Sequence, residues 1–244
     1  LSVGLFFSIV RYCQMPPRWT RLLIAIAISI VSLGLWLSFS RQALLATGIV
    51  LAIIITMTFI NTLLFPKKLF ISVLFALLPL ITFSALFPEL ISTRLSQNAR
   101  LEIQSSFTRE TLQAETLTLI KTSWPMGVGM HNITAKMYER DQQANHHRDA
   151  SSYQPVHNIY LLILTELGIF GLLIFGFFIT SASTYIFSSE LHDRILPFTA
   201  AFSALLIIGF FDHYLWTLHS GILLFWIIAG LTLRQDNIDE RTSF

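Results

Sequence analysis

The chain has 244 residues, of which 54% are hydrophobic and 12% are charged, and its mean hydropathy is +0.65. Soluble domains carry about 25% charged residues, so these values exclude an ordinary soluble protein and favour an integral membrane protein. The net charge of +2 is too small to predict a nucleic-acid partner. The single cysteine, Cys13, excludes an intramolecular disulfide and any cysteine-based metal site.

Apolar segments of about 20 residues, the length that crosses a bilayer, recur along the chain. The chain begins inside one of them, residues 1–10, without an initiator methionine, so we expect it to be the C-terminal part of a longer protein. Six complete spans are predicted after it, at residues 20–39, 42–65, 69–87, 158–187, 195–211 and 215–233. The expected fold is an all-α, polytopic transmembrane helix bundle with six to seven spans.

The spans divide the chain into four predicted parts. Residues 1–87 hold the first transmembrane helices, 88–156 form a long outer loop, 157–233 hold the last transmembrane helices, and 234–244 form a cytoplasmic tail. The orientation rests on the basic residues of the short loops, which concentrate on one side of the membrane: Arg11, Arg18, Arg21, Lys67, Lys68, Arg194, Arg234 and Arg241. Arg41 alone falls in a short loop on the other side. Because basic residues favour the cytoplasm, the C-terminus is predicted inside, and Arg41 and the long loop outside.

The predicted outer loop contains helical segments of its own. Residues 108–122 have helix-forming composition, with Leu112, Leu119 and Ile120 at helical spacing, and they end before Trp124-Pro125. Residues 126–129 predict a turn because of their glycines. A second short helix is expected at 132–140, and the polar segment 140–154 is expected to be mobile or to contact an acceptor.

The most informative motif begins at the outer edge of the fourth complete span. His157-Asn158 is followed after nine residues by Gly168 and Gly171, and Glu166 lies between them, two turns inside the predicted span. A carboxylate inside the membrane is costly unless it is paired, protonated or turned to a polar cavity. A titratable imidazole beside it, at the boundary between water and lipid, indicates chemistry at this edge of the bundle.

This pattern resembles the signature of the O-antigen ligase and polymerase superfamily. Arg109, followed by Pro125 and Gly127-x-Gly129 in the outer loop, is also similar to members of that family. So are Ser40-Arg41 at the start of a span and Asp212-His213 before the last span. Gln113 departs from the pattern, since many relatives carry a tryptophan four residues after the arginine.

The resemblance implies a membrane glycosyltransferase of the bacterial inner membrane, with its active site on the periplasmic or exterior face. Its donor would be a glycan linked to a polyprenyl diphosphate, within the membrane lipid. Its acceptor hydroxyl would belong to the lipid A core in a ligase, to another lipid-linked repeat unit in a polymerase, or to a protein in some relatives. No cofactor or metal is expected, because the diphosphate bond already activates the donor. A transporter of the same lipid-linked glycans is the alternative from another class.

Each candidate residue has an expected role and an ordinary alternative. His157 is predicted to be the catalytic base, because a neutral imidazole with a pKa near 6.5 can take the proton of a hydroxyl; the alternative is an interfacial helix cap. Arg41 and Arg109 are predicted to bind the diphosphate, since guanidinium groups bind phosphate oxygens in a bidentate manner. Asn158 is expected to cap a helix. Glu166 either orients His157 or Arg41 or makes a structural hydrogen bond.

The remaining candidates are expected to shape the site. Gly168 and Gly171 are predicted to allow two helices to approach closely. Asp212 and His213 either end a span as a simple turn or line the site. The adjacent His146 and His147 are expected to lie in a solvated loop, because neighbouring histidines rarely reach one metal ion.

Overall fold

The computed structural model describes residues 1–14, 17–61, 66–95, 100–146, 148–188 and 196–233. Every regular element in these ranges is helical, which confirms the all-α prediction. The elements are α1 (Ser2–Cys13), α2 (Arg18–Leu37), α3 (Arg41–Asn61), α4 (Pro66–Leu86), α5 (Pro88–Leu95), α6 (Arg100–Ser123), α7 (Ile133–Gln143), the 3-10 turn η1 (Ala150–Ser152), α8 (Ile159–Ser188), α9 (Leu196–Ile208), α10 (Tyr214–Thr217) and α11 (His219–Thr232).

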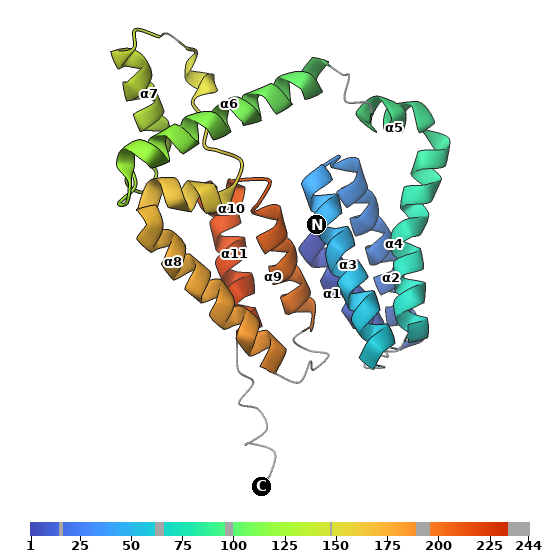
Figure 1. Ribbon diagram of the computed structural model, residues 1–244. Helices are drawn as coiled ribbons and strands as arrows, with labels where there is room; N and C mark the ends of the chain where they lie inside the picture. The colour runs from blue at the N-terminus through green and yellow to red at the C-terminus, as the bar shows by residue number, and fades with distance from the viewer. Residues whose placement is uncertain (15–16, 62–65, 96–99, 147, 189–195, 234–244) are drawn as a thin grey trace.

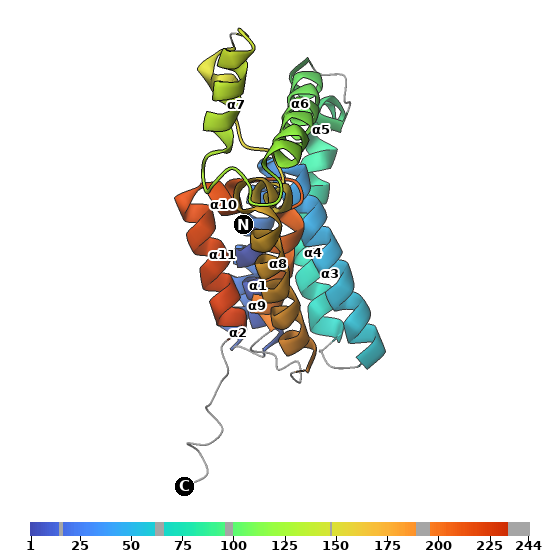
Figure 2. The same cartoon turned by 60° about the vertical axis from the view of Figure 1, so that its left-hand side comes forward.

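The apolar helices form a bundle, and the helices of the predicted outer loop cover one end of it. Helices α1–α4 form one group and α8, α9 and α11 another, while α6 and α7 lie over the end where α3 and α8 begin (Figures 1 and 2). Helix α1 joins the groups, since it packs against both α2 and α9. Its side chains Leu5, Phe6 and Ile9 are buried in one core with Ile28 and Phe202. The covered end therefore brings segments from both groups together.

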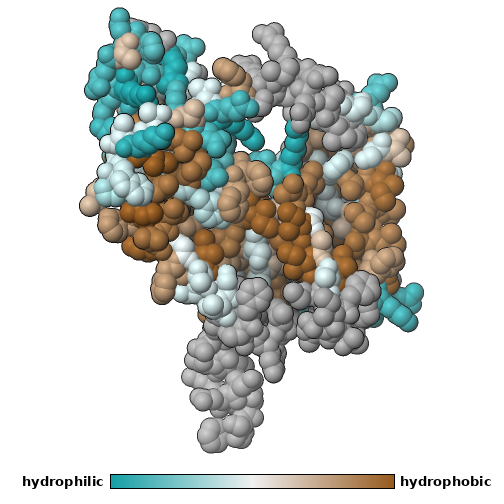
Figure 3. Space-filling view, viewed as in Figure 1, coloured by the Kyte–Doolittle hydropathy of each residue, from teal (hydrophilic) through white to brown (hydrophobic). Residues whose placement is uncertain are grey.

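Among the residues that the structure describes, three helices are long and apolar enough to cross a membrane: Arg18–Leu37, Lys67–Leu86 and Ile159–Thr184. Four further apolar helices are shorter over the residues described: Ser2–Cys13, Arg41–Thr56, Leu196–Ile208 and His219–Thr232. Large apolar side chains on the outer faces are exposed, among them Ile30, Phe70, Ile174 and Phe177. Figure 3 shows, on the face in view, hydrophobic side chains over the bundle and hydrophilic ones over α6 and α7. Exposed apolar side chains gathered in this way mark a surface that contacts a membrane or another protein.

Helix α4 contains a proline whose effect is repaired by its neighbour. Pro79 has no N–H to donate to the carbonyl of Phe75, four residues earlier. The hydroxyl of Ser29 on α2 donates to that carbonyl at 3.1 Å. A free carbonyl in an apolar environment is costly, so this bond compensates for the proline and joins α2 to α4. Ser32 makes a similar bond to the adjacent carbonyl of Ala76.

The outer segment matches the predicted helices in outline. The helix predicted at 108–122 is α6, which begins eight residues earlier, at Arg100, and ends at Ser123 as predicted. The helix predicted at 132–140 is α7, which continues to Gln143. Helix α5 was not predicted. The tail 234–244 and Arg194 lie outside the described residues.

Two predicted spans are wrong in detail. The span predicted at 158–187 is not one straight helix, because Gly168 has φ 68° and ψ −165° in the middle of α8. The region around 215–233 is two helices, because α10 ends at Thr217 and α11 starts at His219. At Gly168 the neighbouring residues Leu167 and Ile169 are apolar, so hydropathy does not reveal the break, whereas Thr217, His219 and Ser220 interrupt the apolar sequence at the second break. Both breaks lie at the covered end of the bundle (Figure 1).

Candidate active site

Asn158 fixes the start of α8, as predicted. Its side-chain Oδ1 accepts hydrogen bonds from the backbone N–H groups of Tyr160 and Leu161 at 2.9 and 3.0 Å, the pattern of a helix N-cap. Its Nδ2 donates to the carbonyl of Phe210 at 3.2 Å, and the N–H of Ile159 donates to Gly209 at 2.8 Å. Asn158 therefore caps α8 and also attaches it to the turn after α9. This double attachment places His157, the preceding residue, beside that turn.

Gly168 breaks α8 after its first nine residues, and the loop between α6 and α7 occupies the break. In an uninterrupted helix Ile169 would donate to the carbonyl of Thr165; here it donates to Pro125 at 3.0 Å. The released carbonyls of Thr165 and Glu166 accept from Val128 and Gly129, at 2.8 and 2.9 Å. The break thus exchanges helical hydrogen bonds for bonds to the loop.

Glycine is required on both sides of this contact. Gly168 has backbone angles that only glycine adopts readily, and a Cβ there would collide with the carbonyl oxygen of Pro125. Gly127 has φ 81°, and a Cβ there would lie 2.6 Å from the carbonyl oxygen of Glu166. Gly171 lies against the side chain of Leu167 across the bend. The predicted role of Gly168 and Gly171 in helix–helix approach is therefore wrong: Gly168 packs against a loop, and Gly171 accommodates the bend.

Glu166 has a buried partner in the turn region. Its side chain is 1% exposed, and Oε2 accepts a hydrogen bond from the indole N–H of Trp216 at 3.0 Å. Glu166 was predicted either to orient His157 or Arg41 or to make a structural hydrogen bond, and this bond to Trp216 is a structural one. Trp216 lies on α10, three residues after His213, so this bond is a second connection between the start of α8 and the α9–α10 turn. Because Glu166 precedes the break, it does not lie on a straight transmembrane helix.

His157, Asp212 and His213 lie together where these two segments meet. The Nδ1 atom of His157 is 3.6 Å from Oδ1 of Asp212, longer than a hydrogen bond, and the two imidazole ring centres are 4.9 Å apart. Asp212 also accepts from the backbone N–H of His213 at 2.8 Å. The side-chain amide of Gln42, on α3, donates to its Oδ2 at 2.8 Å. Three segments distant in sequence therefore converge on one carboxylate.

The environment keeps Asp212 ionised and His213 neutral. Burial alone would raise the pKa of Asp212, but the His157 side chain, the His213 backbone N–H and the nearby imidazoles lower the pKa below its ordinary value. Burial lowers the pKa of His213, and the proximity of His157 lowers it further, against the opposing effect of Asp212. His213 Nδ1 also shares a hydrogen bond with the hydroxyl of Thr217, at 2.7 Å. At neutral pH the cluster thus contains the Asp212 carboxylate beside the neutral imidazole of His213.

The same three side chains could in principle hold a metal ion. One ligand atom from each of His157, Asp212 and His213 lies within 4.8 Å of the others, and two imidazoles with a carboxylate suit a transition metal. However, ligands of one ion must approach to about 2.1 Å from it. His213 Nδ1 is already bonded to Thr217, so this nitrogen would have to give up that bond. Nε2 is therefore the nitrogen of His213 that stays available to an ion or a proton.

Arg41 and Arg109 lie on two different helices, α3 and α6. Arg41 is the first residue of α3 and directly precedes Gln42, which contacts Asp212. Arg109 lies on α6 at helical spacing with the buried Leu112, Thr116 and Leu119, so it shares the face that α6 turns to the bundle. Its own side chain is exposed. Figure 3 shows an opening beneath α6, and Figure 1 places the α9–α10 turn below that helix.

Comparison with known protein families identifies the chain. The sequence profile described as O-antigen ligase matches residues 18–176, well over half of the 244 residues. The chain belongs to the O-antigen ligase family. No curated protein and no solved structure matches it significantly. Membership makes the chain a multi-pass membrane enzyme of the glycosyltransferase type, with lipid-linked glycans as substrates.

The O-antigen ligase match covers only part of the site. It includes Arg41, Arg109, His157 and Glu166, and it stops before Asp212 and His213. The fold nevertheless brings that later turn against His157 (Figure 1). From the sequence, Asp212 and His213 could either line the site or simply form a turn that ends a span. Their contact with His157 favours the first alternative.

Three contacting residues were missed from the sequence. Gln42, Trp216 and Thr217 bind Asp212, Glu166 and His213 respectively. A signal existed for Trp216, since a buried indole N–H needs an acceptor and Glu166 needed a donor. Gln42, next to Arg41 at the start of an apolar span, gave a weaker signal of the same kind.

Proposed function

We propose that this protein transfers a glycan from a polyprenyl diphosphate to a hydroxyl of the lipid A core, on the outer face of the bacterial inner membrane. The observation that carries the proposal is the position of His157. Its imidazole is held beside the ionised Asp212, within the family motif and at the end of the bundle that α6 and α7 cover. A base at this position would lie at the membrane surface, where the lipid-linked substrates of the family are accessible.

The proposed topology has seven spans: α1, α2, α3, α4, α9, α11 and the part of α8 after the break. Residues 169–188 of α8 are about 30 Å long at 1.5 Å per residue, the thickness of the hydrocarbon core. The loop basic residues put the C-terminus in the cytoplasm and the covered end outside. The helices α5, α6 and α7 then belong to the outer segment 88–156, between the membrane parts 1–87 and 157–233.

His157 is proposed to take the proton of the acceptor hydroxyl. Asp212 faces Nδ1 of His157, so an ionised Asp212 favours the tautomer with the proton on Nδ1 and a free Nε2. The free Nε2 accepts the hydroxyl proton as the oxygen attacks C1 of the donor sugar. The bond from C1 to the diphosphate oxygen breaks, and the polyprenyl diphosphate leaves with the electron pair. The distance of 3.6 Å is typical of a site without substrate, where catalytic hydrogen bonds are often long.

The leaving diphosphate requires cations, and two guanidinium groups are proposed to supply them. We assign Arg41 to the phosphate nearer the membrane, because it begins α3 beside Gln42, and Arg109 to the same diphosphate from α6 above. Guanidinium groups stay charged at any working pH and bind phosphate oxygens in pairs. Neutralising the leaving group is expected to be the larger electrostatic contribution to the rate.

The test is transfer by purified protein in lipid vesicles, with a polyprenyl-diphosphate glycan and lipid A core as substrates. His157→Ala is expected to lower kcat by about 100-fold or more, whereas His219→Ala, an exposed histidine on α11, serves as the control. Full activity of the His157→Ala protein would disprove the assignment. Activity that survives EDTA treatment supports a mechanism without a metal.

The glycan profile of a deletion strain separates the related functions. Long polymer that stays lipid-linked and is missing from lipid A supports the ligase proposal. Single repeat units on lipid A would instead indicate a polymerase. Movement of the lipid-linked glycan between leaflets without any transfer product would indicate a transporter.

A further inference from the structure

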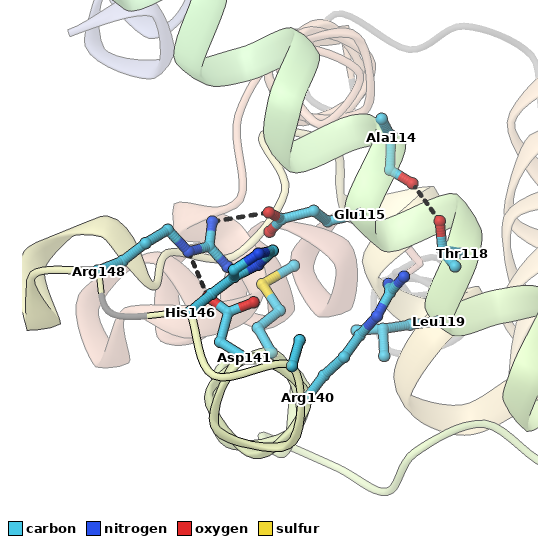
Figure 4. A pocket seen from close by; sticks show the side chains of 10 residues that line it. Ala114, Glu115, Thr118, Leu119, Arg140, Asp141, His146 and Arg148 are labelled. Carbon is cyan, nitrogen blue, oxygen red and sulfur yellow. Dashed lines mark hydrogen bonds and ion pairs between the residues drawn. The ribbon is translucent and has the colours of Figure 1, made fainter.

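A second polar site lies in the outer segment, apart from the His157 cluster. A cavity of about 310 Å3 opens between α6 and α7 (Figure 4). Its polar lining consists of Glu115 and Thr118 from α6, Arg140 and Asp141 from α7, and His146 and Arg148 from the following segment. Leu119 and Met137 form an apolar part of the wall. The volume is at the lower end for small-molecule sites.

One wall of the cavity is fixed by a charge network. Arg148 donates from Nη1 to Glu115 at 2.6 Å and from Nε to Asp141, and so connects α6 with α7 (Figure 4). The hydroxyl of Tyr153 donates to the same Asp141 at 3.1 Å, and the guanidinium lies 4.8 Å from the Tyr153 ring centre. Arg148 is therefore neutralised by two carboxylates and held in place. The segment expected to be mobile is, at Arg148 and Tyr153, attached to both helices.

Other polar groups at the cavity are left without protein partners. The Arg140 and His146 side chains make no hydrogen bond or ion pair with any described residue, and both are exposed. Glu115 Oε2 is buried and has no hydrogen-bond partner, although Oε1 of the same carboxylate binds Arg148. A buried carboxylate oxygen without a donor is costly. The cavity thus offers the unpaired polar groups of Arg140 and His146 to a ligand.

We propose that this cavity binds a sugar ring of the glycan substrates, as a subsite remote from the reacting bond. Two arginines face two carboxylates, so the lining has no net charge and does not favour a free anion. Sugar hydroxyl groups can accept hydrogen bonds from Arg140 and bond to the His146 ring, and the C–H groups of a ring can lie on Leu119 and Met137. The inference rests on the proposed glycan transfer for the origin of the sugar.

A small apolar core connects the proposed subsite to His157. Leu119 and Met137 belong to a small core that also contains Leu112, Ile133 and Val156, and Val156 directly precedes His157. A sugar held in the cavity is therefore held by the same rigid unit that positions the proposed base. Binding energy far from the reacting bond can then orient the substrate for transfer.

Direct binding to the purified full-length protein tests the inference without turnover. The probes are deacylated core oligosaccharide, the water-soluble glycan released from the polyprenyl donor, and inorganic phosphate. Arg140→Ala removes a charged donor, and Ala114→Trp fills the rim of the cavity; each is expected to raise the Kd of one oligosaccharide about 10-fold or more. The matched controls are Lys136→Ala on α7 and Gln113→Trp on α6, neither of which lines the cavity.

The outcomes are distinct. Weaker binding of either oligosaccharide in both cavity variants, with both controls unchanged, supports the subsite and identifies whether donor or acceptor occupies it. Equal binding in all variants, no binding to the native protein, or binding of phosphate alone overturns the inference. Oligosaccharide binding by a native protein that transfers no glycan in the vesicle assay would leave the subsite standing and remove the proposed function. Glycan transfer by the native protein, together with cavity variants that bind the oligosaccharides normally, would remove the subsite and leave the proposed function standing.

Discussion

Two helices of this protein are interrupted, and the two interruptions are repaired in different ways. In α4, Pro79 leaves the carbonyl of Phe75 without its donor, and Ser29 of the neighbouring α2 supplies one. In α8, Gly168 releases two carbonyls and one N–H, and the main chain of the outer loop binds all three. The physical problem is the same, since an unpaired backbone group is costly where water is scarce. Only the second repair joins the bundle to the segment that covers it.

The difference explains where the candidate site lies. A side chain from an adjacent helix repairs α4 and leaves a continuous helix. The loop that repairs α8 holds a bend open, so the first turns of the helix approach the α9–α10 turn, where Glu166 meets Trp216 and His157 meets Asp212. A change at α4 should therefore affect stability alone, whereas a change at α8 should affect stability and transfer.

The largest effect is expected from Gly168→Ala. The side chain would meet the carbonyl of Pro125, and the backbone angles are unfavourable for alanine, so the loop cannot remain docked. We expect a loss of about 3 kcal/mol or more in the free energy of unfolding and loss of glycan transfer. Gly176→Ala, in the same helix, is the control, because nothing lies within 4 Å of its Cβ position. Thermal melting in detergent and the vesicle assay measure both; equal melting temperatures for the two variants would contradict the role of the bend.

Removing the partner of Glu166 should have the next largest effect. Trp216→Phe leaves a buried carboxylate without its donor, which costs about 1–3 kcal/mol, and it should lower kcat by displacing the α9–α10 turn. Glu166→Gln keeps an acceptor oxygen and should retain most activity. The double variant Glu166→Leu with Trp216→Phe removes both polar groups and should be more stable than Trp216→Phe alone. Additive losses in this cycle would show that the two side chains are independent.

A pH effect on stability should follow from His213. Because its pKa is lowered in the folded protein, the unfolded chain binds more protons as pH falls through the ordinary histidine value of about 6.5. The melting temperature should therefore fall between pH 7 and pH 5. The pKa of Asp212 is lowered in the folded protein, so its ionised form stabilises the fold at pH values above the ordinary aspartate pKa. This stabilisation is lost only as the pH falls toward and below that pKa. Asp212 therefore adds little to the change in melting temperature between pH 7 and pH 5. His213→Gln should flatten the profile; an unchanged slope would assign the effect elsewhere.

The smallest effect is expected from Ser29→Ala on α2. It leaves the Phe75 carbonyl without a donor and should cost about 0.6 kcal/mol, the average for such bonds within membranes. In a Pro79→Ala background the restored N–H can bind that carbonyl, so the same serine change should cost less. Glycan transfer should stay at the native rate in these variants. If Ser29→Ala also abolished glycan transfer, the bond at α4 would affect function as the loop at α8 does, and the two interruptions would not differ in this respect.

Much of the fold, and part of the site, could be predicted from the sequence. Continuous apolar segments predicted the bundle, and Asn158 was recognised as a cap because its position before a helix is informative by itself. The break at Gly168 could not be predicted, because apolar residues continue on both sides of it and the partner loop lies some forty residues earlier. The approach of Asp212 to His157 likewise depends on how α9 packs against α1 and α3, which no local pattern encodes.

The docking of the loop at Gly168 has a consequence for motion. Its three bonds are made by main-chain groups alone, so the amide hydrogens of Val128, Gly129 and Ile169 should exchange with deuterium as slowly as those of the bundle core. The covering helices α6 and α7 would then travel with α8 as one body. The lipid-linked substrate would then enter laterally from the membrane, beneath helices α6 and α7 that stay in place. Opening and closing of these helices would not be a step of turnover.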